Sequence, residues 1–128
     1  MGAVQNEEKV LDSYEKNYFK DKLLEFFIYN KWVLLDLTWW LSNIDKIEKL
    51  IIKYQDFSKQ LVKNDVEKVF SFRLKSINGN IISLIQILWE SKWDIIDYYS
   101  NKAKIINLLK SINNWTKNFL NDMESKKI

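Results

Sequence analysis

The sequence predicts an all-α protein, an antiparallel up-down-up-down four-helix bundle formed by a single domain of residues 1–128. Apolar residues recur at intervals of three or four along the whole chain, which is the spacing of one helix face, and no segment alternates with the period of two typical of strands. The chain has no proline and two glycines, so little interrupts the helices. Apolar residues make up 47% of the chain, which is enough for a core.

The first helix is predicted over residues 6–29, with Asn30 as the break that ends it. Asp21 is a candidate start for a second segment inside it. Apolar and aromatic residues recur here at spacings near three and four: Val10, Tyr14, Tyr18 and Leu24, with Phe26, Phe27 and Ile28.

The second helix is predicted over residues 31–63, where the apolar stripe is most regular. Its members are Leu34, Leu37, Leu41, Ile44, Ile47, Ile51, Tyr54, Phe57 and Leu61. A break at Ser42–Asn43 is the alternative, because serine and asparagine favour helix caps.

The second half of the chain carries four candidate boundaries. Asn64–Asp65 predicts a turn, and Asn78–Gly79–Asn80 predicts a kink or short loop because three poor helix formers meet there. Ser91 followed by Asp94 resembles a capping box, and Ser100–Asn101 is the last boundary. The final helix is expected to end near residue 122, with residues 123–128 frayed. True breaks at Ser42, Gly79 or Ser91 would give five or six helices.

The residue types exclude most catalytic chemistry. Histidine and cysteine are absent, so the chain has no imidazole base, no thiol nucleophile and no usual zinc or haem ligands. Gly79 stands alone and forms no glycine-rich phosphate loop. We therefore expect no cofactor, no metal, no catalytic residue and no enzymatic activity.

One enzymatic alternative uses carboxylates. Glu90, Asp94 and Asp97 share one predicted helix face, and Asp45 and Glu48 share another. Two such pairs on facing helices could hold Mg²⁺ in a hydrolase. The pairs resemble the acidic pairs of the all-α nucleotide pyrophosphohydrolases of the MazG type, although the residue types differ and nothing else matches. The simpler interpretation is a solvated helix face.

The charge pattern is that of an ordinary surface. The net charge is +3, and acidic and basic residues are interspersed. Arg73 is the single arginine, so sequence-specific nucleic-acid recognition is not expected. The preference for lysine over arginine is typical of an AT-rich genome. The first residues lack the features of a secretory signal, and with no cysteine we expect a cytoplasmic protein.

The remaining candidates for function are aromatic residues. They form two adjacent pairs, Trp39–Trp40 and Tyr98–Tyr99, and Trp89 and Trp93 lie four residues apart on one helix face. Successive residues on a helix diverge by about 100°, so both members of an adjacent pair cannot point into a narrow core. Core packing is one interpretation and a partner-binding surface is the other. We expect at least two of the following to be exposed: Trp39, Trp40, Trp89, Trp93, Tyr98 and Tyr99.

These observations favour a non-enzymatic protein of the accessory, viral or immunity type. It would bind a protein partner, or further copies of itself, through an aromatic-rich helix face. The alternative is a bundle lying on a membrane surface through residues 32–41 beside Lys31. Within that segment Asp36 is expected to be exposed; if buried, it would need Arg73 or a lysine as its partner.

Overall fold

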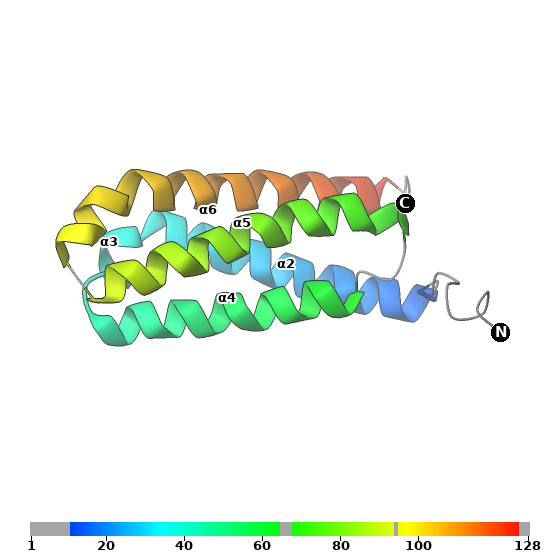
Figure 1. Cartoon of the computed structure of the whole chain (residues 1–128). Coiled ribbons are helices and arrows are strands. Elements are labelled where there is room, and N and C mark those ends of the chain that lie inside the picture. The colour runs from blue at the N-terminus through cyan, green and yellow to red at the C-terminus, as the bar shows by residue number, and fades with distance from the viewer. Residues whose placement is uncertain (1–10, 65–67, 94, 126–128) are drawn as a thin grey trace.

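The computed structural model describes residues 11–64, 68–93 and 95–125, and for residues 68–70, 93 and 95–99 it describes the backbone without the side chains. These residues form helices α2 (Ser13–Leu35), α3 (Leu37–Trp40), α4 (Ile44–Asn64), α5 (Lys68–Trp93) and α6 (Ile95–Glu124). No strand occurs among them. The four long helices alternate in direction, and α3 lies at the end of the bundle where α2 turns into α4 (Figure 1). The predicted all-α, up-down-up-down bundle is confirmed.

The core lies along the axis shared by the four long helices. α5 packs against both α4 and α6, and α2 packs against α6. α2 meets α4 through aromatic rings: Phe26 stacks on Phe57 with ring centroids 3.7 Å apart and contacts Tyr54 edge-on at 5.4 Å. Burial of these rings together with the aliphatic core is the main stabilising term in a bundle of this length.

The start of α2 follows from its sequence. Asp12 is the N-cap: its Oδ1 accepts from the Glu15 backbone N–H at 2.8 Å, and Glu15 Oε1 accepts from the Asp12 N–H at 3.4 Å. This reciprocal pair is a capping box, which satisfies two donors that a helix start leaves free.

The predicted helix break at Asn30 is wrong, and so is the predicted segment start at Asp21. α2 passes through both residues without interruption. Asn30 is fully buried, its Nδ2 donates to the Leu109 carbonyl of α6 at 2.9 Å, and its Oδ1 accepts from the Tyr54 hydroxyl at 2.8 Å. The amide is satisfied by other helices, so it does not compete with its own backbone.

The continuous helix predicted over residues 31–63 is also wrong, and the alternative break at Ser42–Asn43 is confirmed. Ser42 Oγ donates to the Trp39 carbonyl at 2.7 Å, closing the end of α3. Asn43 Oδ1 accepts from the Lys46 backbone N–H at 2.9 Å at the start of α4. Asn43 thus acts as an N-cap, as its side chain favours, and Ser42 satisfies a carbonyl just beyond the C-cap Leu41 of α3.

Gly79 marks no loop or break in the helix, contrary to one form of the prediction. α5 runs through it, between Ile77 and Ile81, which are both fully buried. The neighbouring asparagines are also satisfied: Asn78 accepts from the Ser58 hydroxyl of α4, and the Asn80 amide donates to a backbone carbonyl one turn earlier. Burial of the two isoleucines holds the helix across three weak helix formers.

The turn predicted at Asn64–Asp65 agrees with the end of α4 at Asn64, and Asp65 lies outside the described residues. The boundaries predicted further along the chain fall inside helices. Ser91 is no N-cap, because it lies near the end of α5 and its Oγ donates to the Ile87 carbonyl at 2.8 Å. Asp94 lies outside the described residues. Ser100–Asn101 is interior to α6. In the tail expected to fray from residue 123, Met123 and Glu124 are helical, and Met123 packs against the core.

Candidate functional site

Three of the aromatic candidates with described side chains lie at the same end of the bundle. α3 carries Trp39 and Trp40, and the last turns of α5, which reach the same end, carry Trp89 (Figure 1). We call these three tryptophans the aromatic end. Trp93 closes α5, and Tyr98 and Tyr99 lie near the start of α6, but the structure does not describe their side chains.

Trp39 and Trp40 point in different directions, as adjacent helix residues are expected to do. Trp39 is 52% exposed. Trp40 is half-buried, with its ring centroid 5.8 Å from that of Tyr29 and 4.7 Å from that of Trp39. The Lys46 ammonium lies 4.1 Å from the centre of the Trp39 ring and also donates to Ser42 Oγ at 3.1 Å. Trp39 is thus held rigidly at the surface by a ring contact and a cation.

Trp89 lies in a similar setting on α5. It is 40% exposed, and the Lys92 ammonium lies 4.5 Å from its ring centre. Lys92 also pairs with Glu48 of α4, with Nζ and Oε1 separated by 2.9 Å. This ion pair joins the end of α5 to the start of α4 and fixes the lysine over the tryptophan.

The structure also exposes an apolar surface that the sequence analysis missed. Tyr14, Tyr18 and Ile28, which belong to the apolar spacing that predicts the first helix, point away from the core, and so do Trp32 and Leu35. Their exposed fractions range from 48% for Ile28 to 77% for Tyr14. Together with Asp21 and Glu25 they form one stripe along the outer face of α2, which we call the outer stripe.

The spacing of the outer stripe was the signal that could have revealed it. Its seven positions are separated by four, three, four, three, four and three residues, which is a regular helical seam. The inward seam of α2 has the same spacing, and its buried members are Phe19, Leu23, Phe26, Asn30 and Val33. α2 is therefore apolar on two faces, one of which the bundle covers.

Two carboxylates of the hydrolase alternative, Glu48 and Glu90, contact protein groups, whereas Asp45 is exposed at the start of α4. Glu48 pairs with Lys92, and Glu90 accepts from the Asn101 amide at 3.4 Å. Among the described residues no three acidic side chains converge as a metal site would require. The side chains of Asp94 and Asp97 lie outside the described part. Asp36 is exposed, as predicted, and Arg73 pairs instead with Asp122 of α6.

Burial raises the pKa values of two tyrosines, Tyr29 and Tyr54. Burial raises the pKa of Tyr29 to about 12. Burial, and then the neighbouring Tyr29, raises the pKa of Tyr54 well above its ordinary value. Both phenols therefore stay protonated at neutral pH, and Tyr54 acts as a hydrogen-bond donor in the core.

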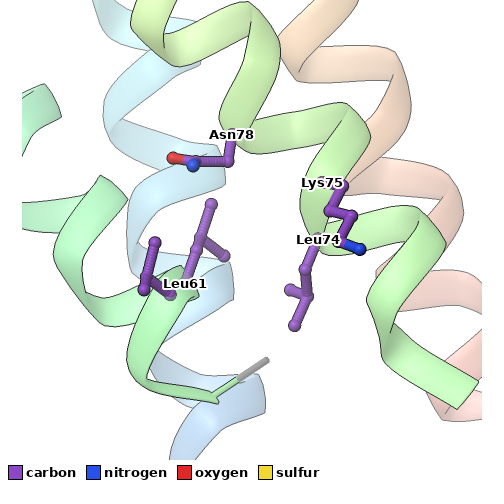
Figure 2. Close-up of a pocket in the computed structure, with 5 residues that line it drawn as sticks. Leu61, Leu74, Lys75 and Asn78 are labelled. Carbon is purple, nitrogen blue, oxygen red and sulfur yellow. The ribbon is translucent and has the colours of Figure 1, made fainter. Parts of the chain in front are cut away.

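Three hollows in the described surface lie between helices. Figure 2 shows one between α4 and α5, where Leu61 and Leu74 lie on either side of a space of about 20 Å³, room for roughly one water. A groove of about 400 Å³ separates α2 from α6, and the Lys20–Glu124 ion pair joins two of the residues that line it. A second, of about 430 Å³, lies between α5 and α6 and is lined by Arg73 and Asp122, which form an ion pair.

Comparisons of the chain with protein-family models, with curated proteins and with solved structures find no match. The fold and the site together define a class of protein, a helical bundle with an uncovered aromatic surface. They assign the chain to no family. Among the described residues, no helix combines the length and the apolar character that crossing a membrane requires.

Proposed function

We propose that this protein acts without catalysis, by binding a protein partner through the aromatic end and the outer stripe that adjoins it. One observation carries the proposal: α2 has two apolar faces, and the bundle covers the inner one. A helix that only had to support the bundle would be polar on its outer side, as α4 largely is. Large exposed apolar stripes mark interaction sites in soluble proteins.

The chemistry of the exposed residues supports the same conclusion. Tryptophan and tyrosine are the residue types that most often dominate binding energy at interfaces. Trp32, Trp39 and Trp89 are all exposed, and Trp39 and Trp89 are each held in place by a lysine. Side chains ordered before binding lose less conformational entropy when the partner arrives.

The test is to recover the partner from the native host with tagged protein. We expect Trp39→Ser and Trp89→Ser to weaken binding by about 2 kcal/mol or more each, as hot-spot residues do. Lys59→Ser and Lys104→Ser are matched controls at exposed positions on α4 and α6, and they should bind as the wild type does. Urea denaturation should show all four variants folded. Equal recovery of partners with tryptophan and control variants would disprove the proposal, and light scattering would show whether the partner is a second copy.

A membrane-surface role is the second candidate. Trp32 and Leu35 are exposed near the end of α2, Trp39 is exposed on α3, and Lys31 is exposed beside them. Aromatic and apolar residues flanked by lysine suit the interface of an anionic bilayer. Sedimentation with vesicles of anionic phospholipid tests this candidate. Binding that disappears in Trp32→Ser would favour it over the protein partner.

A further inference from the structure

The outer stripe has the geometry of one strand of a coiled coil. Its spacing of alternating four and three residues continues from Tyr14 to Leu35, three heptads in length. At 1.5 Å per residue it extends roughly 30 Å along α2. A second helix laid along it would meet apolar side chains near both ends of the stripe.

The centre of the outer stripe is acidic. Asp21 and Glu25 take the third and fourth of the seven positions, and both are exposed. Asp21 forms no ion pair with the described residues. Glu25 has one partner, Lys22 on the flank of the stripe, at 3.5 Å, and Lys22 also lies 5.5 Å from the centre of the Tyr18 ring. An exposed pair at that distance is weak, so the centre of the stripe remains negative.

This charge pattern argues against a second copy as the occupant. In a parallel pairing of two outer stripes, each acid would face the same acid of the other chain. In an antiparallel pairing that overlaps most of the stripe, Asp21 of each chain would face Glu25 of the other. Like charges placed face to face on a helical seam oppose association, and acids at seam positions are a known way to specify the partner.

We infer that the outer stripe binds an amphipathic helix of a different protein, one that carries lysine or arginine at the centre of its seam and apolar residues on both sides. The basic side chains would pair with Asp21 and Glu25, while apolar side chains would cover Tyr14 and Tyr18 at one end and Ile28, Trp32 and Leu35 at the other. This is helix-on-helix recognition with charge setting the specificity. The inference rests on the proposed function and names the partner class for it.

The experiment tests whether this protein binds a charge-reversed variant of itself. The variant Asp21→Lys/Glu25→Lys carries the outer stripe with a basic centre, which is the pattern inferred for the partner. Wild type and variant are studied by sedimentation velocity, each alone and in an equimolar mixture. The control variant Asp56→Lys/Glu90→Lys makes the same change of charge at two exposed acids on α4 and α5.

We expect each protein alone to be monomeric, and the mixture of wild type with Asp21→Lys/Glu25→Lys to form a heterodimer. Its dissociation constant should be at least about tenfold below that of either protein with itself, because repulsion at the centre becomes attraction. The mixture with the control variant should show no such gain. Added salt should weaken the heterodimer.

Three outcomes would overturn the inference. Dimers of the wild type alone that Trp32→Ser disrupts would make a second copy the occupant. Equal association of the wild type with the lysine variant and with the control variant would show that the acidic centre does not select a basic partner. Binding to anionic vesicles by the lysine variant and by the wild type alike, without heterodimers, would make the occupant a membrane. The first two leave the protein-binding function standing, since that function is judged by Trp39→Ser and Trp89→Ser with the native partner.

Discussion

Tyr54 and Asn30 are joined inside the bundle by a hydrogen bond of 2.8 Å, in which the phenol donates to the amide oxygen. Both side chains are 0% exposed. Because the Asn30 amide also donates to the Leu109 carbonyl, one side chain links α2, α4 and α6. A buried polar group of this kind fixes the relative positions of the helices that share it, as an apolar residue of the same size would not.

Replacing Tyr54 by phenylalanine should lower the free energy of unfolding by about 1–3 kcal/mol, because the buried Asn30 oxygen then has no donor. Urea denaturation monitored by circular dichroism measures the change. Tyr18→Phe removes the same hydroxyl from an exposed site and should have little effect. Equal losses in the two variants would show that the buried hydrogen bond adds nothing.

Alkaline pH should destabilise the fold through Tyr29. Its pKa is about 12 in the folded protein against 10.0 ordinarily, so between these values the folded state holds the proton more firmly than the unfolded state does. The stabilisation is complete below about pH 10 and is lost as the pH rises towards 12. The free energy of unfolding of the wild type, minus that of Tyr29→Phe, should therefore be larger near pH 8 than above about pH 11. An unchanged difference would mean that Tyr29 does not contribute.

Gly79→Ala should raise the free energy of unfolding by about 1 kcal/mol, because alanine favours a helix interior and glycine loses more entropy there. Gly79 is exposed within α5, and a Cβ atom at this position would have nothing within 4 Å. Ser83→Gly, at another exposed position of α5, is the reverse control and should destabilise. A loss of stability in Gly79→Ala would show that the backbone there needs glycine.

The fold class could be predicted from the sequence because apolar spacing alone decides it. α4 is the clearest case: Ile47, Ile51, Tyr54, Phe57 and Leu61 belong to one predicted stripe and are buried, although Ile44 of the same stripe is exposed. Helix ends were harder to predict. Asn30 and Gly79 resemble breaks locally. Asn30 stays helical because residues of other helices satisfy its amide, and Gly79 stays helical because Ile77 and Ile81 beside it are buried against other helices. No local pattern contains this information.

The aromatic end was predicted in part, since the adjacency of Trp39 and Trp40 requires that one of them leave the core. The outer stripe was not predicted. Tyr14 and Tyr18 have helical spacing, but spacing identifies a face of a helix without saying which way it points. When a helix is apolar on two faces, as α2 is, the choice between them depends on where the other helices pack.

Filling the centre of the outer stripe with apolar residues should convert the protein into a homodimer. In Asp21→Leu/Glu25→Leu all seven seam positions are apolar or aromatic, and the charges that keep two copies apart are gone. We expect sedimentation velocity to show dimers at micromolar concentration, with the free energy of unfolding of the monomer little changed because both sites are exposed. Asp56→Leu/Glu90→Leu adds the same apolar surface away from the stripe and should remain monomeric. Trp32→Ser, placed in the leucine variant, should restore the monomer by removing the largest seam residue. If the leucine and control variants associate to the same extent, the association is non-specific hydrophobic association. The acids at the centre of the stripe then have no role in keeping copies of this protein apart.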